Sequence, residues 1–149
     1  MERSKYNVSP DVEKRSHAGI VFDSAVEMRF YRDVVLPGMG SGTITFCERQ
    51  KPYVLQPKFT HDGKNVAAIN YVADFYLEFP DGTSMVIDIK GMPDTVAKIK
   101  RKLFWYNYPN TDYRWVCYSK IDGGWCDYED VVKHRRERKK ERAEKAKGE

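Results

Sequence analysis

The sequence predicts a mixed α/β fold in which helices flank one central sheet. Three observations support this prediction: an alternating β-hairpin (71–79 and 84–90), a helical segment on each side of it (24–36 and 95–106), and a further β-prone run at 113–119. Strands and helices that alternate along one chain are expected to pack in layers around a single core. A chain of 149 residues can bury such a core without disulfides.

The first helix is expected from about Ser24 to Leu36, and the Pro37–Gly42 segment is expected to end it. On a helical wheel, Glu27 lies in the middle of the apolar arc, so its carboxylate should face the sheet. A carboxylate in that position is costly unless it is paired or binds a metal. A local explanation stays open, because Ser24 and Glu27 also match a capping box.

The segments after the first helix complete the predicted sheet. Two β-prone stretches are expected at 43–50 and 52–59, followed by a turn at 61–65. The second helix should begin after the capping residue Asp94, and it carries an apolar stripe that is expected to pack against the sheet: Val96, Ile99, Leu103 and Tyr106. Residues 1–20 are expected to be a flexible segment, and 21–130 the folded domain.

The basic charge is concentrated at the C-terminus. Residues 133–149 contain nine Lys or Arg and four Glu, whereas the rest of the chain holds 17 basic and 18 acidic residues. We therefore expect residues 131–149 to be a basic tail, helical or disordered, that suits a polyanionic partner such as nucleic acid. A solvated charged helix without a partner is an equally good explanation of the tail.

Composition excludes several other classes of protein. No apolar run approaches the roughly 20 residues of a membrane span, and the first residues lack the apolar segment of a signal peptide, so we expect a cytoplasmic protein without a membrane partner. The three cysteines form no C-x-x-C pair, which argues against disulfides and zinc. A bound metal would therefore need oxygen ligands, which favours Mg²⁺ or Mn²⁺.

The hairpin determines which side chains meet. Pro80, Asp81 and Gly82 suit a three-residue loop with the glycine in the left-handed conformation. In the resulting register Asp74 lies opposite Asp88, and Lys90 lies on the same face opposite Val72. The other face is apolar, with Ala73 opposite Ile89, and its residues on the first strand are Tyr71, Ala73, Phe75, Leu77 and Phe79. A two-residue loop would shift the register by one and set apolar residues against polar ones.

Two carboxylates in opposite positions of a hairpin repel each other. Their Cβ atoms are expected about 5 Å apart, which is destabilising unless one group is protonated or a cation lies between them. A hard divalent cation fits between two carboxylates. The alternative is an exposed strand face on which both charges are simply solvated.

These residues resemble the PD-(D/E)XK nuclease superfamily. The resemblance rests on Asp74 in YVADF, on Asp88, Ile89 and Lys90 in VIDIKG, and on the upstream Glu27. It covers residues 22–119 and looks closest to small phage endonucleases and Holliday junction resolvases. Two positions depart from the usual pattern, because Ala73 replaces a proline and the second acid is Asp rather than Glu.

The resemblance implies a restriction-endonuclease-like αβββαβ core and an Mg²⁺- or Mn²⁺-dependent endonuclease. Asp74 and Asp88 would hold the metal, with Glu27 and the Ile89 carbonyl as further ligands, and Lys90 would orient the attacking water. The expected substrate is branched DNA cut by a homodimer, in the host cytoplasm if the chain is phage-encoded.

Basic residues outside the motif are candidates for contacts to phosphates. They lie on the second helix and in the tail: Lys98, Lys100, Arg101, Lys102, Arg135 and Arg136. An ordinary solvated helix face explains them equally well. The competing hypothesis for the whole chain is a non-catalytic DNA-binding or inhibitor protein that keeps a nuclease-like fold.

Overall fold

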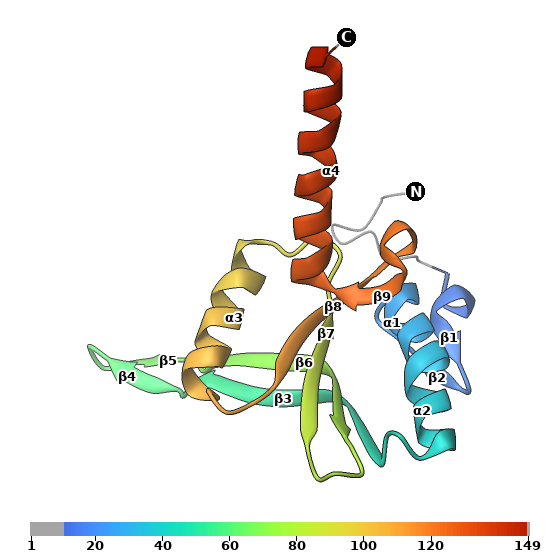
Figure 1. Ribbon diagram of the computed structural model, residues 1–149. Helices are drawn as coiled ribbons and strands as arrows, with labels where there is room; N and C mark the ends of the chain where they lie inside the picture. Colours follow the sequence, from blue (N-terminus) through green and yellow to red (C-terminus); the bar gives the residue numbers. More distant parts are fainter. Residues whose placement is uncertain (1–10, 149) are drawn as a thin grey trace.

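The protein is a mixed α/β domain built on one five-stranded sheet (Figure 1). The computed structural model describes residues 11–148. The elements follow in the order η1 (Glu13–Arg15), β1 (Ser16–His17), β2 (Ile20–Val21), α1 (Ala25–Phe30), η2 (Tyr31–Val35), α2 (Leu36–Ser41), β3 (Phe46–Gln56), β4 (Phe59–His61), β5 (Lys64–Val66), β6 (Ile69–Glu78), β7 (Ser84–Ile89), α3 (Thr95–Asn107), β8 (Tyr113–Ser119), η3 (Lys120–Asp122), β9 (Gly124–Asp127) and α4 (Tyr128–Gly148). The predicted fold class is confirmed.

The central sheet has the strand order β3-β6-β7-β8-β9. Neighbours are antiparallel except β7 and β8, which are parallel and are connected through α3. Two apolar clusters cover the two faces. One contains α1, η2 and Ile87, and the other contains α3 and Val86, the neighbour of Ile87 on β7. Because successive strand residues point to opposite faces, α1 and α3 lie in different layers.

The first helical segment is longer than expected. Ser24 caps α1 as predicted, but the chain stays helical through Pro37, and the helical segment ends only at Ser41. The intervening turn η2 is a π-helix, in which the N–H of Leu36 bonds to the carbonyl of Tyr31. A widened turn accommodates a proline because the proline ring would otherwise collide with the carbonyl four residues earlier.

One strand, β3, replaces the two β-prone segments predicted at 43–50 and 52–59. Pro52 lies inside this strand, and β3 tolerates it because it is at the edge of the sheet, where a missing N–H breaks no ladder on the outer side. The predicted turn at 61–65 is confirmed as the tip of the β4-β5 hairpin, with Asp62 and Gly63 both at positive φ.

The long hairpin of β3 and β6 exchanges its two faces in the middle. Phe75 and Leu77 pack in the α1 layer, whereas Tyr71 and Ala73, with the same alternation, pack in the α3 layer. The prediction that all four share one face is therefore wrong. On β3, Gln50 has φ +53° and lies between the pairs Arg49–Phe75 and Lys51–Ala73, which places the irregularity beside Asp74.

Helix α3 also buries a different side from the one predicted. Phe104 is fully buried in an aromatic cluster, whereas Val96, Ile99 and Tyr106 of the predicted stripe are exposed. Four tyrosine rings surround Phe104 within 5.5 Å, measured between centroids: Tyr53, Tyr71, Tyr108 and Tyr113. The large ring area of this cluster decides the orientation of the helix.

The two ends of the chain carry more regular structure than expected. Residues 11–20, expected to be flexible, form η1 and the short β1-β2 hairpin, and Arg15 bonds to the carbonyl of Phe22; residues 1–10 of the predicted segment lie outside the described part. The basic tail is a continuous helix, α4, which buries only Val131 and projects away from the sheet (Figure 1). None of the helices within residues 11–148 is long and apolar enough to cross a membrane.

The orientation of α3 predicts two opposite outcomes for neighbouring aromatic residues. Phe104→Ala should lower the free energy of unfolding by about 3–5 kcal/mol, because it empties the centre of a packed cluster. Tyr106→Ala should change it by less than about 0.5 kcal/mol, because that ring is exposed. Urea unfolding of both variants checks this, and an equal loss in the two would contradict the observed orientation.

Candidate active site

Strands β6 and β7 separate at the two predicted acids. Four backbone pairs, from Glu78–Ser84 to Phe75–Ile87, have the register that the three-residue loop predicts. Gly82 takes a positive φ of 85° in that loop. The ladder of backbone pairs then stops. The next predicted pairs, Ala73 with Ile89 and Val72 with Lys90, are not part of it.

Carboxylate side chains take the place of the missing ladder bonds. The backbone N–H of Asp74 donates to Oδ1 of Asp88 at 3.2 Å, and the N–H of Ile89 donates to Oδ2 of Asp74 at 2.8 Å. The two acids therefore lie side by side, as predicted, and each is tied to the other strand. The sequence suggested the carbonyl of Ile89 as a ligand, but it is the N–H of this residue that contacts Asp74.

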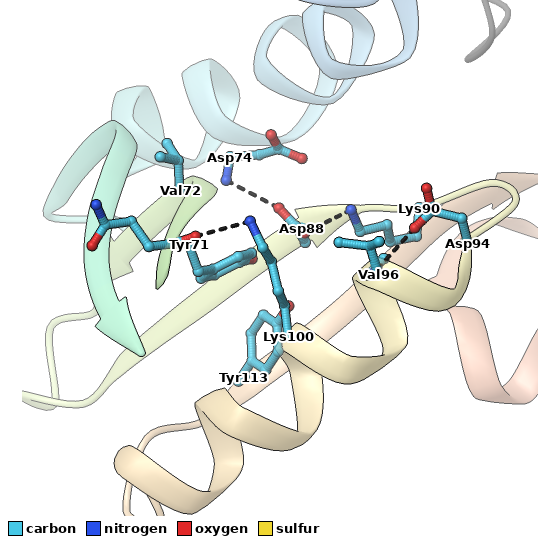
Figure 2. Close-up of a pocket in the computed structure, with 11 residues that line it drawn as sticks. Tyr71, Val72, Asp74, Asp88, Lys90, Asp94, Val96, Lys100 and Tyr113 are labelled. Atoms are coloured by element: carbon cyan, nitrogen blue, oxygen red, sulfur yellow. Dashed lines mark hydrogen bonds and ion pairs between the residues drawn. The ribbon is translucent and has the colours of Figure 1, made fainter. Parts of the chain in front are cut away.

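Lys90 completes the cluster. Its Nζ lies 3.0 Å from Oδ2 of Asp88, which is only 2% exposed, and its backbone N–H bonds to the carbonyl of Val116 on β8. Figure 2 shows Asp74, Asp88 and Lys90 together at one pocket. The lysine is thus held by the parallel strand and keeps its ammonium group at the pocket surface, where it is partly exposed.

Burial and neighbouring negative charge suppress the ionisation of Asp74 in the absence of a cation. The pKa of Asp74 is raised to about 9, first by burial and then by the neighbouring charges of Asp88 and Glu27. The N–H of Ile89 lowers it, but not enough to compensate. Asp74 is therefore protonated at neutral pH in the metal-free protein, and a cation bound beside it would favour its ionised form.

Glu27 belongs to the same electrostatic cluster. Its pKa is raised to about 7, first by burial and then by the charges of Asp23 and Asp88. Ser24 both caps the helix, by accepting from the N–H of Glu27 at 3.1 Å, and hydrogen-bonds to the Glu27 carboxylate. Oε2 of Glu27 is nevertheless buried without a partner. Capping and an inward-facing carboxylate oxygen thus occur together.

The acids and the lysine line an open pocket of about 450 Å³ between β6, β7 and the start of α3. Sequence reasoning missed most of its other walls, which are Asn70, Tyr71, Val72, Asp94, Val96, Ala97 and Tyr113. Burial raises the pKa of both Tyr71 and Tyr113, and the nearby Asp88 carboxylate raises it in the same direction. The alternation of the strand predicts Tyr71 on the apolar face, away from the acids. The parallel register that brings Tyr113 close to Asp88 cannot be read from neighbouring residues in the sequence.

The predicted phosphate-contacting residues fall into three groups. Lys100 lines the pocket and donates to the carbonyl of Asn70 at 2.9 Å, and Lys98 and Lys102 are exposed on α3. Arg101 is engaged elsewhere: it pairs with Glu129 and lies 3.9 Å from the centroid of Trp115. Arg135 and Arg136 are exposed on α4 and do not line the pocket.

Comparison with known families covers most of the chain. A family described as "Protein of unknown function (DUF1064)" matches residues 3–122. This chain belongs to that family. No curated protein matches the chain. The whole cluster of Glu27, Asp74, Asp88 and Lys90 lies inside the DUF1064 region, whereas α4 lies outside it.

The residues fit a hydrated divalent cation better than a closed metal cage. Within residues 11–148, no three His, Cys, Asp or Glu side chains form a group suited to hold a metal ion. Mg²⁺ is commonly held by only one or two carboxylates and keeps several waters. The adjacent Asp74 and Asp88 supply that number, and the unpartnered Oε2 of Glu27 offers a hydrogen-bond acceptor for a bound water.

The raised pKa of Asp74 predicts how stability depends on pH without divalent metal. Its folded-state pKa of about 9 exceeds the unfolded value, so the folded state binds the proton more tightly and loses stability as the pH rises from about 4 to 9. Asp74→Asn keeps the acceptor for Ile89 and removes the charge. It should be more stable than wild type by about 1–3 kcal/mol near pH 8 and nearly equal near pH 4.

Urea unfolding in EDTA across this pH range measures the difference. Glu78→Gln is the matched control, because Glu78 is an exposed carboxylate on the same strand. A variant at position 74 that is less stable than wild type at pH 8 would show that the ionised carboxylate stabilises the fold.

Proposed function

We propose that this chain is an Mg²⁺-dependent DNA endonuclease that hydrolyses phosphodiester bonds. The observation that carries the proposal is the pair of adjacent carboxylates on β6 and β7 with a lysine ammonium 3.0 Å from one of them, at an open pocket. The resemblance of Asp74, Asp88, Ile89 and Lys90 to the PD-(D/E)XK motif supports the same activity.

Asp74 and Asp88 would hold the cation. A divalent ion would supply the positive charge that favours ionised Asp74 in a site where burial and the nearby Asp88 and Glu27 otherwise keep it protonated, so the acids of the metal-free site would become its ligands. Bound there, Mg²⁺ would polarise a phosphoryl oxygen and lower the pKa of a coordinated water. The bonds from the N–H groups of Asp74 and Ile89 fix the two carboxylates before the ion binds.

Lys90 and Glu27 supply the other polar groups of the proposed reaction. The Lys90 ammonium, fixed by Asp88 and by the strand β8, donates to a phosphoryl oxygen or to the attacking water and stabilises the negative charge that develops. Glu27, with a pKa of about 7 and a buried oxygen without a partner, accepts a hydrogen bond from water in the site. Lys100 extends the positive charge along the pocket wall and contacts a neighbouring phosphate.

Cleavage assays with purified full-length protein test the proposal. Wild type should cut DNA in Mg²⁺ or Mn²⁺ and not in EDTA, whereas Asp88→Asn and Lys90→Gln should lower the rate by about 100-fold or more. Glu27→Gln should have a smaller effect, on the order of 10-fold, because water can replace part of its role. Glu78→Gln should cut like wild type.

Two results would contradict the proposal. If wild type cuts neither DNA nor RNA while still binding DNA, the chain is a non-catalytic DNA-binding protein on this fold. If wild type cuts and the variants at positions 88 and 90 cut equally well, the active site lies elsewhere. A four-way junction and a linear duplex in the same assay test the junction-resolving activity, and sedimentation tests the homodimer that this activity needs.

A further inference from the structure

The outer face of α3 is apolar and cationic at once. We use this name for Lys98, Ile99, Lys102, Trp105 and Tyr106. Tyr106 is 84% exposed, Ile99 53% and Trp105 47%, although a folded protein normally buries most of such side chains. The face is exposed because α3 packs through Phe104, and two residues along a helix turn the side chain by about 200°.

The outer face carries positive charge without any compensating acid. Helix α3 contains four basic residues and no acidic ones between Thr95 and Asn107. Arg101 pairs with Glu129 and lies over the rings of Trp115 and Trp105, and Lys100 points into the active-site pocket region, where it donates to the carbonyl of Asn70. Lys98 and Lys102 form no ion pair with any residue in 11–148, so their charges remain available to a partner outside the chain.

The outer face is continuous with the candidate active site. Val96, Ala97 and Lys100 line the pocket that contains Asp88 and Lys90, and Figure 2 shows α3 beginning beside Asp94 at that pocket and running away from it. Val96 is itself 59% exposed and lies between the pocket and Ile99. A strand of nucleic acid with one phosphate in the pocket therefore meets α3 next.

We propose that the outer face of α3 binds unpaired nucleotides next to the active site, an inference that rests on the proposed function. Lys98 and Lys102 contact phosphates, while Tyr106 and Trp105 stack on bases and Ile99 packs against them. Only unpaired bases expose the flat surfaces that aromatic side chains need. The preferred substrate therefore has single-stranded character at the cleavage site.

A second copy of the chain fits this face less well. Two outer faces in contact would bring Lys98 and Lys102 of one copy near those of the other, and neither face contains an acid to pair with them. Like charges that lose water without partners oppose such contacts. A polyanion has the opposite charge, and its bases satisfy the apolar side chains.

Binding to labelled oligonucleotides tests the proposal without requiring cleavage. In EDTA, full-length protein should bind an oligothymidine of about 20 nucleotides more tightly than a duplex of equal length. This length is enough for several stacking contacts. Tyr106→Ala should weaken oligothymidine binding by about 5- to 100-fold and duplex binding by less than about 2-fold. The control is Tyr118→Ala, which should bind like wild type. Tyr118 is an exposed tyrosine whose ring meets Trp125 edge-on in the α1 layer.

The charged residues should behave differently from the aromatic ones. The double variant Lys98→Gln, Lys102→Gln should bind both the oligothymidine and the duplex more weakly. The slope of its binding constant against salt concentration should fall by the equivalent of about two phosphate contacts. Because the proposed substrate is DNA, wild type should bind oligothymidine more tightly than oligouridine of the same length. Tighter binding of oligouridine would contradict a DNA ligand at this face.

Two outcomes would overturn the proposal. One is equal binding of oligothymidine by wild type and Tyr106→Ala. The other is a wild-type dimer in sedimentation that Tyr106→Ala converts to a monomer, which would make the face an interface between copies. Failure of the nuclease proposal is separate: a protein that cuts nothing but loses oligothymidine binding through Tyr106→Ala retains the binding site.

Discussion

The contact between the side chains of Asp74 and Asp88 organises this protein. Two neighbouring strands stop pairing through their backbones at these residues, and the carboxylates accept the N–H groups that the sheet leaves free. Buried acids so close together are unfavourable unless a proton or a cation joins them, and the raised pKa of Asp74 expresses that cost. The pocket lies at the same place, between the separating ends of β6 and β7 and the start of α3.

The rest of the fold brings further groups to this point. The face exchange beside Gln50 places Asp74 between the two layers, with Glu27 contributing from the α1 layer and Asp88 from the α3 layer. The parallel pairing of β7 and β8 anchors Lys90 through the carbonyl of Val116. The separation of β6 from β7, the face exchange and the parallel pairing thus position one cluster of charges, which is typical of a site that has a function.

Local patterns in the sequence were sufficient to predict the hairpin and its acids. The Pro80, Asp81 and Gly82 loop set the register, and alternation of apolar residues then placed Asp74 beside Asp88. The Ser24 and Glu27 pair also predicted both the cap of α1 and the inward carboxylate. These predictions depend on residues within one turn or one hairpin, where backbone geometry leaves few alternatives.

Features that depend on long-range packing could not be predicted in the same way. Val96, Ile99 and Tyr106 form a good apolar stripe, but Phe104 packs among tyrosines from three strands and turns that stripe outward. The faces of β3 and β6 exchange beside Gln50, which has a left-handed backbone conformation. The sequence has no glycine at this position that would predict such a conformation. The proximity of Tyr113 to Asp88 likewise depends on the crossover through α3.

The most direct test of a divalent cation between the two acids is calorimetric titration of Mn²⁺ at about pH 7.5 in buffers of different ionisation enthalpy. Binding should release roughly one proton, because the ion displaces the proton that Asp74 holds, and the heat of binding should vanish in the double variant Asp74→Asn, Asp88→Asn. Mn²⁺ binding that persists unchanged in the double variant, or no binding to wild type, would contradict the account.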